Sequence, residues 1–262
     1  MGDEQPELLL ERDGAVLSLR LNRPDKLNAL TAAMFDGLSE ALSAAQEDDG
    51  VRAIMFSGEG SSYTAGRDIG EFATANSAGV VDISKAPPAR AIQALMRLSK
   101  PVVASVRGQA VGFGMTMLLH CDLVVAAPDA VLSAPFVSLG LSPEAGSSLL
   151  LSRLVGHQRA FALFALGKRL SGEEASSWGL VHELQPADQC DAVALALAHR
   201  LAELPPEAMR QTKGLMRRSQ ELLAVQEEES RVFGRLLAGD EAAQAFRTFR
   251  QRPKTEHPAV RS

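Results

Sequence analysis

The sequence contains only two cysteines in 262 residues, Cys121 and Cys190. They form neither a disulfide framework nor a set of zinc ligands, which fits a reducing compartment. Four histidines stand apart from one another without the spacing of metal ligands: His157, His182, His199 and His257. The sequence therefore predicts no metal site and no dependence on disulfides.

Long apolar runs and an excess of positive charge are missing too. No apolar stretch approaches the roughly 18 residues of a membrane span. The first 14 residues are acidic and lack the basic-then-apolar order of a signal peptide. The net charge is −5 with scattered basic residues, and the chain ends HPAVRS without a peroxisomal signal. We therefore expect a cytoplasmic protein with no membrane or nucleic-acid partner.

The first 60 residues alternate strand and helix patterns. Leu8–Leu10 and Ala15–Leu21 are apolar runs separated by Asp13-Gly14, which predicts a hairpin. Thr31 is placed to cap a helix that runs to about Gln46, and Val51–Phe56 follows as a buried strand. This order indicates an α/β fold, in one large domain or two small ones.

The middle of the chain continues the pattern and the last third becomes helical. Strands are expected at Val102–Val106, Asp122–Ala126 and Val131–Ser133, with a helix at Gly112–Leu119 and a mobile loop or broken helix at Phe72–Pro88. Ser171 and Glu174 form a capping box for a short helix. Three further helices are predicted, at Ala187–Leu204, Glu207–Ala238 and Glu241–Arg250. These helices form either a subdomain or an oligomerisation layer.

Two short motifs suggest chemistry that the residues do not support. The glycines Gly112 and Gly114 begin a dinucleotide fingerprint, but its third glycine is replaced by Met117. They serve either tight packing or the exposure of N–H groups at a helix N-terminus. His120-Cys121-Asp122 resembles a nucleophile cluster, yet adjacent side chains point in different directions. We interpret it as a helix end leading into a strand.

Glu144 is the acidic residue proposed as the catalytic base. It follows Ser142-Pro143, which is typical of a helix start with Ser142 as the cap. Its neighbours Phe136, Leu139 and Leu149 are apolar. Either Glu144 stabilises a helix N-terminus, or it is a buried base with a raised pKa, in which case burial should outweigh the helix dipole.

Several segments resemble the crotonase (enoyl-CoA hydratase/isomerase) superfamily over nearly the whole chain. The matching segments are NRPDKLNAL (Asn22–Leu30), AGRDI (Ala65–Ile69), KPVVASVRGQAVGFG (Lys100–Gly114), the Cys121-Asp122 pair, GKRLSGEEASSWGLV (Gly167–Val181), PEAMRQTKGLM (Pro206–Met216) and AFRTFRQRPK (Ala245–Lys254). The resemblance implies a crotonase fold of stacked β-β-α turns in residues 1–200. It also implies a C-terminal helical oligomerisation region, 201–262, that builds a homotrimer or a hexamer.

The resemblance implies an acyl-CoA thioester as substrate and no separate cofactor. The thioester oxygen would lie between the backbone N–H groups of Arg67 and Phe113, which stabilise an enolate. The family pattern also implies residues that bind CoA or the acyl chain: Lys26, Leu27, Ala65, Gly66, Asp68, Ile69, Gly112, Phe136 and Phe246. Phe249 stands where many relatives carry a lysine directed at the CoA phosphates.

Departures from the family pattern bear on the reaction. The two glutamates of the family's hydratases are replaced by Thr116 and Phe136, which cannot act as acids or bases near neutral pH. The segment around Glu144 instead resembles the peroxisomal-type Δ3,Δ2-enoyl-CoA isomerases, which use a single glutamate there. The expected activity is conversion of 3-enoyl-CoA to trans-2-enoyl-CoA. Alternatives are another crotonase reaction (hydratase, hydrolase, decarboxylase or ring isomerase) and a non-catalytic acyl-CoA-binding protein.

Overall fold

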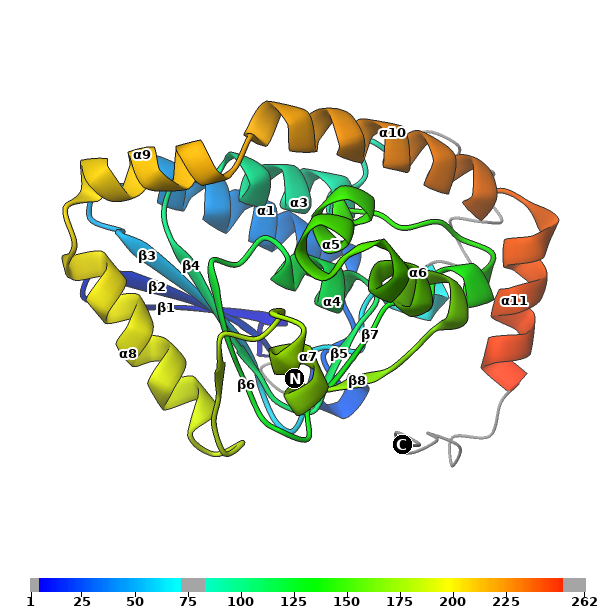
Figure 1. Cartoon of the computed structure of the whole chain (residues 1–262), viewed down its shortest axis with the longest axis horizontal. Coiled ribbons are helices and arrows are strands. Elements are labelled where there is room, and N and C mark those ends of the chain that lie inside the picture. The colour runs from blue at the N-terminus through cyan, green and yellow to red at the C-terminus, as the bar shows by residue number, and fades with distance from the viewer. Residues whose placement is uncertain (1–4, 72–82, 252–262) are drawn as a thin grey trace.

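A computed structural model describes residues 5–71 and 83–251 of the chain. The larger of its two sheets has six strands in the order β1-β2-β3-β4-β6-β9 (Figure 1). β1 and β2 are antiparallel, and each later pair is parallel. The strands are β1 (Leu8–Asp13), β2 (Val16–Leu21), β3 (Ala53–Gly58), β4 (Val102–Val106), β6 (Leu123–Ala126) and β9 (Glu183–Leu184). The predicted hairpin and the strands predicted at Val51–Phe56, Val102–Val106 and Asp122–Ala126 are confirmed.

A second sheet of three short strands lies beside the first, in the order β5-β7-β8. Its strands are β5 (Gln109–Val111), β7 (Val131–Ser133) and β8 (Leu170–Ser171). Thr64 joins this sheet through a parallel bridge to Ala110. Because β5 and β8 are only three and two residues long, the periodicity of the sequence did not reveal them.

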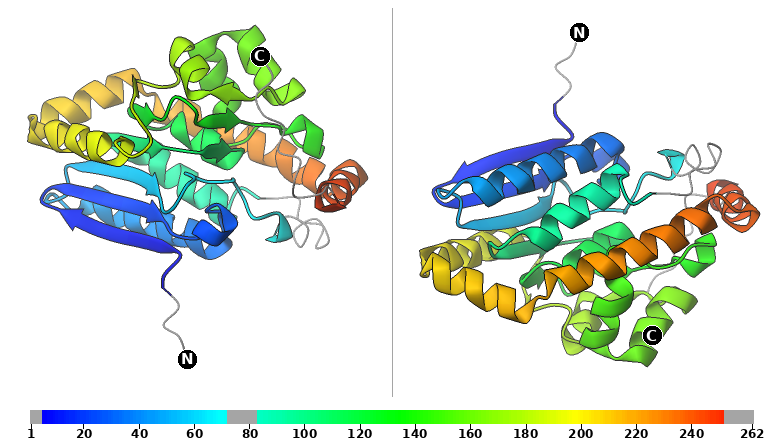
Figure 2. Two further views of the ribbon diagram at one scale, coloured as in Figure 1. Left: turned by 90° about the horizontal axis from the view of Figure 1, so that it is seen from below. Right: turned by 90° about the horizontal axis from the view of Figure 1, so that it is seen from above.

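Helices cover both faces of the larger sheet. α1 and α3 lie on one face and α8 on the other (Figure 1). Seen from above, α10 runs alongside α3, which in turn lies beside α1 (Figure 2). The helices are α1 (Ala32–Glu47), α3 (Pro87–Arg97), α4 (Phe113–Leu118), α5 (Ser147–Val155), α6 (His157–Leu166), α7 (Gly172–Ser177), α8 (Cys190–Glu203), α9 (Pro206–Met216), α10 (Ser219–Leu237) and α11 (Asp240–Gln251), with 3-10 turns η1 (Pro24–Lys26) and η2 (Val137–Leu139). No helix within the described ranges is long and apolar enough to cross a membrane.

Two predicted helix caps are present. The Thr31 hydroxyl accepts a hydrogen bond from the Met34 N–H at the start of α1. Ser171 and Glu174 form the reciprocal capping box of α7. Such caps depend on residues three positions apart, so the sequence alone reveals them. The predicted segment Phe72–Pro88 lies mostly outside the described residues, as do the side chain of Phe249 and all of His257.

The single helix predicted for Glu207–Ala238 is wrong, because α9 ends at Met216 and α10 begins at Ser219. Arg217 and Arg218 between them have ψ angles of 114° and 81°, outside the helical region. The Arg217 guanidinium donates to the carbonyls of Leu119 and Cys121 at 3.0 and 3.2 Å. These distant contacts favour the break, at which no proline stands; Gly214, two residues before the end of α9, is the only local signal of it within that helix.

A buried ion pair fastens α9 to the larger sheet. Lys213 is 7% exposed, and its Nζ lies 2.7 Å from Oδ2 of Asp122 and 2.6 Å from the Lys100 carbonyl oxygen. The same Asp122 oxygen accepts from the Val102 N–H at the start of β4. Lys213 therefore connects α9 to the N-terminal ends of β4 and β6.

We expect Lys213→Met to lower the free energy of unfolding by about 3 kcal/mol, because it leaves a partly buried carboxylate without its main cation. Denaturant titration measures this loss. Lys168→Met is the matched control, since the Lys168–Glu174 pair is 39% exposed on both sides and should contribute less than about 1 kcal/mol. Equal effects of the two substitutions would contradict this role for Lys213.

Candidate active site

Glu144 lies in the loop between η2 and α5, not in the first turn of a helix. α5 begins at Ser147, after Ala145 and Gly146 adopt left-handed φ angles of 63° and 68°. The predicted helix start with Ser142 as cap is therefore wrong. These two residues turn the chain before the helix begins, so the carboxylate is not in a dipole-favoured first turn as predicted.

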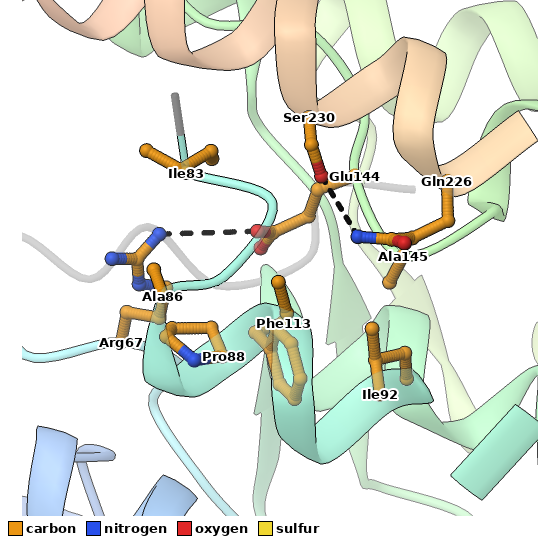
Figure 3. A pocket seen from close by; sticks show the side chains of 11 residues that line it. Arg67, Ile83, Ala86, Pro88, Ile92, Phe113, Glu144, Ala145, Gln226 and Ser230 are labelled. Carbon is orange, nitrogen blue, oxygen red and sulfur yellow. Dashed lines mark hydrogen bonds and ion pairs between the residues drawn. The ribbon is translucent and has the colours of Figure 1, made fainter. Parts of the chain in front are cut away.

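The Glu144 carboxylate is buried in a small pocket. The residue is 8% exposed. Most of the side chains that line the pocket are apolar, and they come from the segment before α3, from α3, from α4 and from the base's own loop: Ile83, Ala86, Pro88, Ala89, Ile92, Phe113 and Ala145 (Figure 3). The remaining lining residues are Arg67, Gln226 and Ser230. Among the described lining residues, Glu144 is the only acid.

Burial raises the pKa of Glu144 to about 7, against the opposing effect of the Arg67 cation and with an added increase from the Glu229 carboxylate. The prediction that burial determines the direction of this shift is confirmed. A carboxyl group with a pKa near 7 can both take a proton from a substrate and return it at neutral pH. This property distinguishes Glu144 from an ordinary ion-pairing carboxylate.

The side chain of Arg67 faces this base. Its Nη1 lies 3.9 Å from Oε2 of Glu144, and the two side chains are 14% and 10% exposed (Figure 3). Burial lowers the pKa of Arg67, while the charges of Glu144 and Glu71 raise it. A guanidinium stays protonated in a protein, so the pair is charged whenever Glu144 is ionised. From the sequence, only the backbone N–H of Arg67 was expected to act in the site, as a donor to the thioester oxygen.

The backbone of Gly66, the residue before Arg67, closely approaches the backbone of Val111 and Phe113. Leu30 exchanges hydrogen bonds with Gly66 and Asp68, so the Arg67 backbone groups point to the opposite side, as in any parallel bridge. A Cβ added to Gly66 would lie 2.5 Å from the Val111 carbonyl oxygen and 3.8 Å from the Phe113 nitrogen. Phe113 is the first residue of α4, where an N–H group has no acceptor within the helix.

Most of the other residues predicted to bind CoA lie on two segments, the η1 turn and Ala65–Ile69, which a backbone hydrogen bond joins into one strip. The Ala65 N–H donates to the Leu27 carbonyl oxygen at 2.8 Å, which joins the η1 turn to the Ala65–Ile69 segment. Lys26 is exposed at the end of η1. Asp68 faces Arg23, whose Nη1 lies 3.4 Å from its Oδ2. Gly112, with φ of 54°, precedes α4.

Phe136 and Phe246 are buried but lie outside the lining of the Glu144 pocket. The Phe136 ring packs against Phe164 and Phe233 at centroid distances of 5.9 and 6.5 Å. Thr116 is fully buried, and its hydroxyl donates to the Phe113 carbonyl oxygen at 3.1 Å. Its side chain therefore supports α4 from within and presents no acid or base.

α10 supplies two pocket residues that were not predicted from the sequence. Gln226 and Ser230 line the pocket, and the Gln226 amide donates to the Ser230 hydroxyl at 2.8 Å (Figure 3). Their positions, four apart, place them on the helix face that also buries Leu222 and Phe233. Polar residues on the apolar face of an amphipathic helix are the signal that would have identified them.

The sequence and the fold match known proteins over most of the chain. A sequence model described as enoyl-CoA hydratase/isomerase matches residues 11–257. The 2,3-dehydroadipyl-CoA hydratase of Escherichia coli is 33% identical, over 94% of this chain and 96% of that protein. The enoyl-CoA delta isomerase 2 of Rattus norvegicus is 32% identical, over 94% of this chain and 64% of that protein. The structure of Pseudomonas aeruginosa OdaA covers 95% of this chain with a TM-score of 0.90 and 41% identity.

The raised pKa of Glu144 has a consequence for stability. Between pH 4.5 and about 7 the folded protein holds a proton that the unfolded chain releases, so stability falls as pH rises through this window. We expect Glu144→Gln to be more stable than the wild type near pH 8, by about 3 kcal/mol at most, and equally stable near pH 4. Thermal unfolding across this pH range tests it. A wild type that is no less stable than Glu144→Gln near pH 8 would contradict it.

Proposed function

The chain belongs to the enoyl-CoA hydratase/isomerase family, and we propose that it converts 3-enoyl-CoA to trans-2-enoyl-CoA with Glu144 as the only base. The observation that carries this proposal is a buried carboxyl group with a pKa of about 7, the only acid among the described residues that line its pocket, beside two converging backbone segments. A 1,3-shift of a double bond needs one group that removes a proton and returns it. Glu144 has the pKa for both steps.

In the proposed reaction, Glu144 removes a proton from C2 of the 3-enoyl thioester. The electron pair of the broken C–H bond delocalises into the thioester carbonyl and forms a dienolate. The backbone N–H groups of Arg67 and Phe113 donate to the resulting oxyanion, which stabilises it by a few kcal/mol for each donor. Glu144 then returns the same proton to C4, and the double bond moves to C2–C3. No water is consumed and no electrons leave the substrate, so the reaction needs no cofactor.

Two features weigh against hydration as the main reaction. Adding water to a 2-enoyl thioester requires one group that activates the water and another that supplies a proton. Thr116, at one of the positions that hydratases use, donates its hydroxyl hydrogen to the Phe113 carbonyl oxygen. Phe136, at the other, has no ionisable group. The apolar lining around Glu144 also disfavours a bound nucleophilic water.

We also propose a path for the CoA moiety and an assembly. The strip that joins Lys26 and Leu27 to Ala65–Ile69 would bind the pantetheine arm and the adenine, with the Lys26 ammonium exposed towards the phosphates. Residues 201–262 would form the contacts of a homotrimer or of a dimer of trimers. A cytoplasmic location is part of the same proposal.

We expect Glu144→Gln to lower the rate of double-bond migration at least about 100-fold, because the amide cannot accept the C2 proton. The assay follows formation of the conjugated thioester from a 3-enoyl-CoA, with Glu40→Gln on the exposed face of α1 as the control. Retained activity in Glu144→Gln would rule out this base. Mass spectrometry separates isomerised from hydrated or hydrolysed products, and binding without turnover by the wild type would indicate an acyl-CoA-binding protein.

We expect Arg67→Met to move the acidic limb of the pH profile of kcat/KM about one unit towards higher pH. The cation favours the ionised form of Glu144, so its removal raises the pKa of the base. The substitution keeps the backbone N–H that is assigned to the oxyanion. Arg67→Lys retains the positive charge and should titrate close to the wild type. An unchanged profile in Arg67→Met would show that the ion pair does not tune the base.

A further inference from the structure

The loop that carries Glu144 holds a conformation that its own sequence disfavours. Ala145 has a φ of 63°, in the left-handed region that costs a non-glycine residue about 1 kcal/mol. Gly146 follows with a φ of 68° as the N-cap of α5, and as a glycine it has no side chain that could supply a capping oxygen. The conformation therefore depends on contacts from elsewhere in the chain.

Glu229 of α10 supplies one of these contacts. Its Oε2 accepts from the Gly146 N–H at 2.5 Å, and its Oε1 accepts from the Ser148 N–H at 2.9 Å. The residue is 7% exposed. A carboxylate more than 80 residues further along the chain thus caps α5 and fixes the backbone two residues after Glu144.

His120, just after α4, supplies the second contact. Its Nε2 lies 2.7 Å from the Ala145 carbonyl oxygen, and the ring is fully buried. Burial lowers the pKa of His120 to about 3, so the imidazole is neutral at neutral pH. A carbonyl oxygen only accepts, so Nε2 carries the proton and donates it. His120 and Glu229 thus hold the backbone on both sides of the peptide bond that joins Ala145 to Gly146.

We propose that Glu229 and His120 are positioning residues that lock the Ala145–Gly146 backbone and thereby aim the Glu144 carboxylate, with Glu229 also placing a negative charge behind the base. This inference rests on the proposed function of Glu144. It gives a role to the histidine of the His120-Cys121-Asp122 motif, which needs no contact with the substrate. It also makes α10 part of the machinery that prepares the base.

The charges around Glu144 predict how each residue acts. Arg67, in the Ala65–Ile69 segment, places its cation beside Glu144. Glu229 of α10 acts on Glu144 with a negative charge. His120 is neutral, because burial and the charges of Arg217 and Lys213 lower its pKa. The Glu229 charge raises the pKa of Glu144 whereas the Arg67 charge lowers it. Removing the charge of Glu229 should therefore shift the base in the direction opposite to removing Arg67.

The experiment compares Glu229→Gln and His120→Phe with the wild type. The glutamine keeps one acceptor oxygen but turns an amide NH2 towards the second N–H, and it removes the charge. The phenylalanine removes the hydrogen bond to Ala145 without changing any charge. Glu228→Gln is the matched control, because Glu228 is the preceding residue of α10 and is exposed, paired only with Arg231 at the surface.

Three quantities are measured for each variant: kcat and KM with a 3-enoyl-CoA, the thermal midpoint, and the pKa of Glu144. The pKa comes from 13C NMR of glutamate side-chain carboxyls, with the signal assigned by its loss in Glu144→Gln. We expect Glu229→Gln and His120→Phe each to lower kcat about 10- to 100-fold with KM within about threefold, as misaligned groups do. Only Glu229→Gln should lower the pKa of Glu144, and Glu228→Gln should match the wild type.

Some outcomes would overturn the proposal. Wild-type kcat and wild-type Glu144 pKa in Glu229→Gln would show that its carboxylate neither aims nor tunes the base. A lower thermal midpoint with unchanged kcat and pKa would make Glu229 a helix cap alone. If the wild type does not isomerise 3-enoyl-CoA, the proposed function fails, and the NMR titration still decides whether Glu229 acts on Glu144.

Discussion

The removal of the Glu144 carboxylate from water is the constraint on which the rest of the site depends. Desolvation makes the ionised form costly, and the apolar side chains around it offer no hydrogen bonds in return. The Arg67 guanidinium compensates in part from 3.9 Å away, which is too far for a direct hydrogen bond. The pKa of Glu144 is therefore about 7, so that its charged and neutral forms are both populated near neutral pH, as the proposed proton transfer requires.

The catalytic role proposed for Glu144 and the stability of the fold make opposite demands on its pKa. A carboxylate with an ordinary pKa would be more stable in the fold but too weak a base to remove an α-proton. Burial raises the basicity, and the fold bears the cost wherever Glu144 is ionised. The strained Ala145 adds to this cost, and the contacts from Glu229 and His120 compensate for it.

Local signals and family motifs predicted most of the fold, and the crotonase fold is confirmed. The structure brings Arg67, Phe113 and Glu144 to one pocket, whereas their predicted roles stay predictions. Caps such as Thr31 and Ser171 depend on neighbours three residues away, so the sequence encodes them directly. Long-range contacts explain the errors. The helix start predicted at Ser142 followed local preference, but the helix begins where Glu229 of α10 caps it. The break at Arg217 likewise depends on carbonyls about a hundred residues earlier in the chain.

The position of α10 late in the sequence determines when the site can form during synthesis. Five of the six strands of the larger sheet, the Arg67 loop and α4 lie within the first half of the chain, and they can associate as the nascent polypeptide leaves the ribosome. The Glu144 loop receives its cap only after residue 229 has emerged. Until then the strained turn lacks that partner and its carboxylate is less constrained. The proposed base is therefore shaped at the end of translation, whereas the backbone proposed to bind the substrate is made much earlier.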